Sequence, residues 1–263
     1  MTEPIFVRTR HEYGSYVDWF RLVELSGFET IYVDELDADS RNTYIVTPLN
    51  GEWQQGWPNA RARIIHYELE LRHDWRADVD TPAGVSEVWC GDAWLADRFG
   101  ARYVPIGSHS GLNIHRPDAQ ISKSFDVAFV AYQVGRRQAV TQELGGMGLH
   151  LTPRDNLWGN ARSTALMASK VMLHVHQMED FPAIAPLRWC LAAAHGLPML
   201  TEYVNNRGVF GFPYMLMAEY RYLAQFVRLQ LRDNAQRLHD MGEGLQRFLC
   251  EDFTFRKSIE EAL

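Results

Sequence analysis

Residues that can do acid–base chemistry follow the apolar runs in the first half of the sequence. They come after the first run and at the ends of the fourth and fifth: His11, Glu12, Glu68 and Asp92. A histidine or a carboxylate at such a place can act as general base toward a hydroxyl group. Two alternatives stay open, a helix-start histidine bonded to the backbone and acids on a solvated strand edge.

Glycine and arginine follow the apolar runs in the second half. Gly135, Arg136 and Arg137 come after the run 126–132, and Arg188 lies near the start of an apolar helical stretch. Glycine lets the backbone approach a ligand, and the arginine fork matches phosphate oxygens. Arginines at a helix start are disfavoured unless an anion or a carboxylate offsets them. The pattern indicates a phosphate site, with surface charge as the alternative.

Further polar residues lie at or beyond the ends of other runs. His174 and His176 form an H-x-H pair on one face of a predicted strand. We interpret this pair as the wall of a pocket, since no third zinc ligand is evident. Candidate ligand contacts are Gly14, Trp158, Glu179 and Glu202. Two D-x-D pairs are interpreted as solvated loop acids: Asp37 with Asp39, and Asp78 with Asp80.

Alternating strands and helices must position these residues. The predicted strands are 4–10, 28–36, 43–49, 62–69, 87–92, 101–107, 126–132, 149–153, 171–176, 198–202 and 215–220. The predicted helices are 15–27, 93–100, 136–148, 160–170 and 185–195, with helical sequence from 222 onward. Strands separated by helices favour right-handed crossovers and doubly wound parallel sheets. The sequence therefore predicts an α/β fold with ligands at the carboxyl ends of the strands.

The polar stretch 108–124 has no clear periodicity and divides the chain. We expect a Rossmann-like domain at 1–115, a second Rossmann-like domain at 116–221, and helices at 222–263. The cleft between two such domains is the expected site. The 263 residues have a net charge of −7 and three scattered cysteines. With no secretory signal and no apolar stretch of bilayer length, the expectation is a cytoplasmic protein without a membrane span.

The second half also resembles a known family. DVAFVAYQVGRRQAV, followed by SKVMLHVHQMEDFPAIAPLRWCLAAAHGLPMLTE, is similar to the C-terminal domain of GT-B fold glycosyltransferases. The nearest likeness is to the bacterial and phage group related to the CgeB spore-maturation protein, which is glycosyltransferase family 1-like. It covers about residues 85–205. The resemblance implies two Rossmann-like domains facing a cleft, with 1–115 as the acceptor-side domain and 116–221 as the nucleotide-sugar-binding domain. It also implies a metal-independent transferase without a bound cofactor.

The resemblance also implies roles for particular residues. Arg136 or Arg137 would contact the donor diphosphate, and Arg188 with the loop before it would hold diphosphate and sugar. Trp158 would border the nucleotide base. Leu191 stands where the family often has a ribose-binding glutamate, so ribose recognition here would differ.

The expected activity is transfer of a sugar, of the hexosyl type, from a nucleotide-diphosphate donor to an acceptor hydroxyl, with a UDP-sugar favoured. A modified DNA base or a protein surface is the expected acceptor, in the host cytoplasm if the protein is phage-encoded. Four arginines could line a DNA groove: Arg61, Arg63, Arg72 and Arg76. The alternatives are a catalytically inactive GT-B-like module that binds nucleotide sugars or glycans, and a sugar-phosphate or nucleoside-processing enzyme. Inverting and retaining mechanisms both stay open.

Overall fold

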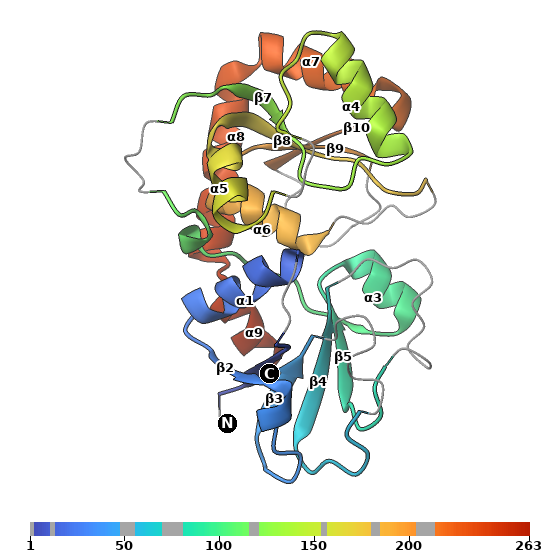
Figure 1. The fold of residues 1–263 in the computed structure, drawn as a ribbon, viewed down its shortest axis with the longest axis vertical. Coiled ribbons are helices and arrows are strands. Elements are labelled where there is room, and N and C mark those ends of the chain that lie inside the picture. Colours follow the sequence, from blue (N-terminus) through green and yellow to red (C-terminus); the bar gives the residue numbers. More distant parts are fainter. Residues whose placement is uncertain are drawn as a thin grey trace.

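Two parallel sheets lie in separate halves of the chain in the computed structural model (Figure 1). The structure describes residues 3–10, 14–47, 56–69, 81–115, 121–153, 157–179, 185–203 and 214–263. The N-terminal sheet has six strands and the C-terminal sheet has four. Every strand pair in the described residues is parallel. The α/β class with two Rossmann-like domains, predicted from the sequence, is confirmed.

The N-terminal half forms around buried aromatic residues. Its strands, in the order β2-β1-β3-β4-β5-β6, are β1 (Ile5–Arg8), β2 (Glu29–Tyr32), β3 (Thr43–Val46), β4 (Arg63–Glu68), β5 (Glu87–Cys90) and β6 (Arg102–Tyr103). Its helices are α1 (Ser15–Leu25) and α3 (Ala93–Phe99). Apolar residues of α1 recur at helical spacing, so Trp19 and Val23 face inward onto Phe6 of β1. Gly27, with φ of 78°, allows the chain to turn after α1.

The C-terminal half repeats this design. Its strands, in the order β10-β9-β8-β7, are β7 (Phe125–Ala128), β8 (Ser169–His174), β9 (Met199–Glu202) and β10 (Met215–Ala218). Its helices are α4 (Arg136–Gly146), α5 (Gly159–Met167), α6 (Pro186–Ala194), α7 (Leu223–Asp233) and α8 (Ala235–Arg247). The strand expected at 149–153 is reduced to one bridge, between Leu151 and Val127. The Thr152 hydroxyl accepts the Phe129 N–H at 3.0 Å, where a ladder would continue.

Helix α6 belongs to the cores of both halves. Leu187, Cys190 and Ala194 pack in the N-terminal core with the aromatic residues of α1. Another set on the same helix packs in the C-terminal core: Trp189, Leu191, Ala192 and Ala193. A helix that is apolar on opposite faces can pack against two cores, and α6 lies at the junction beside α1 (Figure 1).

A histidine fixes the end of α6 to its neighbours. His195 Nε2 lies 2.7 Å from Ser163 Oγ of α5, and its Nδ1 lies 2.7 Å from the Leu191 carbonyl oxygen. A carbonyl only accepts, so Nδ1 carries the proton and the serine hydroxyl donates to Nε2. Ser163 Oγ also accepts the Ile114 N–H of the inter-domain segment at 3.2 Å. Burial lowers the pKa of His195 to about 4, which keeps the imidazole neutral.

The chain crosses between the halves a second time near its C-terminus. After the π-turn Phe248–Asp252, Thr254 pairs with Ser108 of the first crossing. Helix α9 (Phe255–Ala262) then packs in the N-terminal core, where the Phe255 ring centroid is 5.1 Å from that of Trp19. The segment 222–263 is thus divided between the two halves (Figure 1). No helix among the described residues has the length and apolarity to span a membrane.

Candidate active site

A cleft of about 550 Å³ opens between the two halves. Asp18 of α1 and Leu69 after β4 form its N-terminal wall. The C-terminal half supplies the other wall, from the loop after β7, the start of α5 and the first turns of α6: residues 129–134, Pro153, Leu157, Trp158, Arg162, Ala185, Leu187, Arg188 and Leu191. Among the described lining residues, Asp18 is the sole carboxylate and Arg162 and Arg188 are the two cations. Most of the remaining wall is apolar, as in other ligand clefts.

Arg188 lies close enough to Arg137 and Arg162 for both to repel it. Burial, followed by repulsion from Arg137 and Arg162, lowers the pKa of Arg188 to about 9. Burial also lowers the pKa of Arg162 to about 10 and that of Arg137 below its ordinary value. Arg137 Nε donates to the Val175 carbonyl at 2.9 Å. Positive charge held together in this way is typical of a site that binds an anion.

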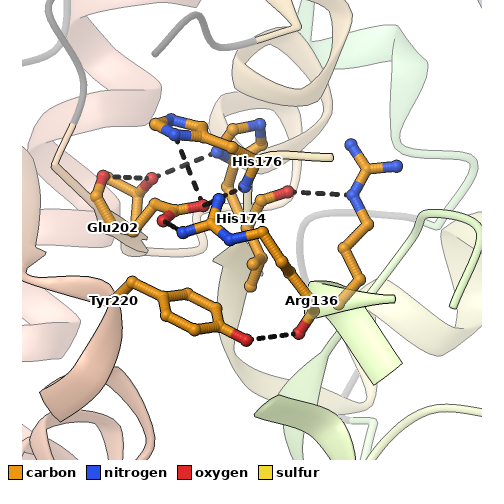
Figure 2. Close-up of polar contacts among 8 residues, drawn as sticks. Arg136, His174, His176, Glu202 and Tyr220 are labelled. Atoms are coloured by element: carbon orange, nitrogen blue, oxygen red, sulfur yellow. Dashed lines mark hydrogen bonds and ion pairs between the residues drawn. The ribbon is translucent and has the colours of Figure 1, made fainter. Parts of the chain in front are cut away.

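Arg136 is already paired with a carboxylate (Figure 2). Its Nη2 donates to Glu202 Oε2 at 2.8 Å, and its guanidinium lies 4.0 Å from the centroid of the Tyr220 ring. Tyr220 donates its hydroxyl proton to the Arg136 carbonyl at 3.0 Å. Glu202 at the end of β9 thus offsets the charge that an arginine brings to the start of α4. Of the two neighbouring arginines, Arg137 is the one that adds charge beside Arg188.

The histidine pair lies behind this network. The His176 backbone N–H donates to Glu202 Oε1, and His176 Nδ1 lies 3.3 Å from the same oxygen (Figure 2). His174 Nδ1 lies 3.1 Å from Thr201 Oγ1. Burial is the first cause, and nearby arginines add to it, so the pKa of His176 falls to about 3. Both rings are therefore neutral near pH 7, and the described residues contain no cluster of three metal-ligating side chains.

The N-terminal candidates for a general base are not brought to the described cleft wall. His11 and Glu12 lie outside the described residues. Glu68 ends β4 with an oxygen 3.2 Å from His66 Nε2, and Asp92 is fully buried and accepts the Leu95 N–H at 3.0 Å as the N-cap of α3. An acid at that position favours the start of a helix. On the C-terminal side, Glu179 is exposed and does not line the described cleft.

The two predicted glycines take equivalent positions in the two halves. Gly14 precedes α1 with φ of 61° and ψ of −130°, and Gly135 precedes α4 with φ of 52° and ψ of −123°. Side chains larger than glycine disfavour this region. A Cβ atom on Gly14 would lie 3.4 Å from the Trp158 ring, so Gly14 lies against the far wall of the cleft.

Asp18 and Arg162 were not among the residues predicted from the sequence. They form an ion pair across the cleft, and the Arg162 guanidinium lies 4.6 Å from the centroid of the Trp158 ring. In the sequence, Asp18 looks like an ordinary first-turn acid of a helix and Arg162 like a helix-face cation. Only the packing of the halves brings them together.

No family model matches the chain. Solved structures are similar over nearly its whole length. AviGT4, a glycosyltransferase involved in avilamycin A biosynthesis, has a TM-score of 0.64 at 12% identity, covering 99% of this chain and 96% of that one. The DNA-modifying enzyme β-glucosyltransferase has a TM-score of 0.56 at 13% identity, covering 100% of this chain and 99% of that one. A glycosyltransferase from Rickettsia africae has a TM-score of 0.55 at 8% identity, covering 98% of this chain and 97% of that one.

At such low sequence identities, structural similarity shows a shared fold only. It agrees with the two parallel sheets in separate halves of the chain. The chain has the two-domain Rossmann-like fold of the GT-B glycosyltransferases.

Proposed function

We propose that the protein is a glycosyltransferase that moves a sugar, of the hexosyl type, from a nucleotide-diphosphate donor to an acceptor hydroxyl. The observation that supports this best is the arginine cluster. Arg162 and Arg188 line the cleft, Arg137 lies close enough to repel Arg188, and Asp18 is the sole carboxylate in the described lining. A diphosphate would supply the negative charge that this group of arginines lacks.

The same charges suit the chemistry of the transfer. When the sugar leaves, negative charge develops on the diphosphate, and fixed cations stabilise it in a site of low polarity. The starts of α4 and α6 also lie beside the cleft, so the positive ends of their helix dipoles favour an anion there. We therefore propose that arginines and helix dipoles perform the charge stabilisation in a metal-independent transfer.

We propose a UDP-sugar as donor. The similar β-glucosyltransferase was solved in the presence and absence of its substrate UDP-glucose. In this chain, Pro153, Leu157 and Trp158 give the cleft an apolar and aromatic wall on which a base can stack. A macromolecular acceptor fits the same comparison, because that neighbour is a DNA-modifying enzyme. For a DNA acceptor the predicted groove is only partly described: Arg63 pairs with Glu87 at 2.8 Å, and Arg72 and Arg76 lie outside the described residues.

A thermal-shift screen tests the donor part of the proposal. UDP, GDP, ADP, CDP and TDP, with UDP-glucose, should each be added at millimolar concentration. Stabilisation by at least one nucleoside diphosphate is the expected result, because a ligand that binds only the folded state raises the melting temperature. If none of them stabilises the protein, the transferase proposal fails.

A second measurement distinguishes an enzyme from a binding module. The module remains a candidate because apolar Leu191 lines the cleft where the resembled family often has a glutamate. Release of UDP from UDP-glucose, with double-stranded DNA containing 5-hydroxymethylcytosine as the acceptor, should exceed release without protein. Retained UDP binding without turnover on DNA or protein acceptors would favour the module.

A further inference from the structure

One ion pair joins the two walls of the cleft. Asp18 comes from α1 of the N-terminal half and Arg162 from α5 of the C-terminal half. The two residues are 5% and 4% exposed, so water screens the pair little. Both also line the cleft. A buried carboxylate and a buried guanidinium stabilise each other here, and neither charge would be tolerated well alone.

Arg162 has hydrogen-bonding capacity that the described residues do not use. Its Nε is buried and has no hydrogen-bond partner among them. One face of its guanidinium lies over the Trp158 ring, which fixes the plane of the group. The side chain is therefore held in a defined orientation beside the cleft, with one donor unpaired.

Asp18 takes the position of an anion in this site. Arg188 and Arg162 repel each other, and the Asp18 carboxylate is the negative charge that the described cleft wall sets against them. A diphosphate has more charge and more acceptor oxygens than a carboxylate, and it can bind more than one arginine at once. A diphosphate in the cleft would thus compete with Asp18 for Arg162.

We propose that Asp18 is a positioning residue that acts through Arg162, holding its guanidinium in the unliganded cleft and releasing it to the donor diphosphate. This inference rests on the proposed function, because it requires a diphosphate ligand. The exchange breaks the contact between α1 and α5. Donor binding is then coupled to loosening of the contact between the two walls.

Calorimetric titration with UDP and with inorganic pyrophosphate tests the exchange. Asp18→Asn removes the competing charge with little change of shape, and should bind UDP about tenfold more tightly than the wild-type protein. Arg162→Gln should bind UDP more weakly. The decisive variant is the double mutant D18N/R162Q, which should bind UDP with the affinity of R162Q alone, because without Arg162 there is nothing for Asp18 to hold. Asp97→Asn, an exposed acid-to-amide change on α3, is the matched control and should leave affinity unchanged.

Several outcomes would overturn the proposal. Unchanged or weaker UDP binding by a folded D18N protein would do so. A tenfold gain that persists in the R162Q background would also do so, because it would be a general effect of charge. Absence of UDP and pyrophosphate binding in both wild type and D18N would instead refute the proposed function, and the inference with it.

A measurement on the wild-type protein covers the case in which D18N does not fold. The side-chain Nε–H signal of Arg162, assigned by its loss in R162Q, can be followed by ¹⁵N NMR during UDP titration. It should shift as the guanidinium changes partner from carboxylate to phosphate. A signal that stays in place while UDP binds would overturn the exchange.

Discussion

Replacing Arg188 by glutamine should weaken nucleotide binding and raise stability at the same time. Arg188 is partly buried on the first turn of α6, and the described residues provide no hydrogen-bond acceptor for its guanidinium. Its neighbours Arg137 and Arg162 repel it. The folded protein therefore holds a charge at an energetic cost, which is typical of a binding residue rather than a packing residue.

The magnitude follows from the lowered pKa. A pKa that falls from 12.5 to about 9 corresponds to roughly 5 kcal/mol against the charged form before solvent screening. Water that reaches this half-buried side chain reduces the effect, so we expect R188Q to gain about 1–2 kcal/mol in free energy of unfolding. Loss of charge-assisted hydrogen bonds to phosphate should weaken UDP binding by about 2–3 kcal/mol, or roughly 30- to 150-fold.

Urea denaturation and calorimetric titration with UDP measure the two quantities. Arg221→Gln is the control and should change neither quantity, since Arg221 is exposed and, among the described residues, contacts its chain neighbours Glu219 and Tyr222. A related effect concerns pH: an anion binds the charged guanidinium, so the UDP affinity of the wild-type protein should fall as pH rises through about 9. A folded R188Q protein with reduced stability and unchanged UDP affinity would show that Arg188 serves packing, and the reasoning would be refuted.

Three further predictions concern stability and selectivity. The pKa of His195 is about 4 in the folded protein, whereas an unfolded histidine titrates near 6.5, so the free energy of unfolding should decrease by up to roughly 3 kcal/mol as pH falls from 7 to 4. Urea denaturation of H195Q should show a smaller decrease over this pH range. A decrease equal to that of the wild-type protein would contradict the assignment to His195. Gly135→Ala should lower the free energy of unfolding by about 1–2 kcal/mol because φ of Gly135 is positive. Gly145→Ala within α4 should instead raise it by about 0.5–1 kcal/mol. Similar melting temperatures for the two variants would argue against backbone strain at Gly135. UDP and 2′-deoxy-UDP should bind within about threefold of each other, since apolar Leu191 offers the ribose hydroxyls no acceptor; a ratio above about tenfold by titration would show that another group reads them.

Local patterns were enough to predict most of the fold. Apolar runs bounded by glycine predicted most strands and helices. Gly14 and Gly135, predicted to let the backbone approach a ligand, both have positive φ. The strand predicted at 149–153 was wrong: this segment lies at a sheet edge, where it forms only a single bridge and the Thr152 side chain replaces the ladder. The amino-acid composition of an apolar segment does not show whether a neighbouring strand will complete its backbone hydrogen bonds.

The site was less predictable because its charges pair over long distances. Glu202 was a candidate ligand contact, but nothing in the sequence indicates that it binds Arg136. The same holds for Asp18 and Arg162, which come from helices of different halves. Arg188 was expected at the cleft because it begins a helix that follows a strand, and it lies there; its contact with a diphosphate stays a prediction.

The shared helix and the returning C-terminus have a consequence for synthesis of the chain. The N-terminal half leaves the ribosome first, yet its core needs Leu187 and Cys190 of α6 and then Phe255 and Ile259 of α9. Its aromatic residues therefore stay partly uncovered until the last helix has emerged. The half that is made first completes its core last, and neither half should be obtainable as a stable fragment.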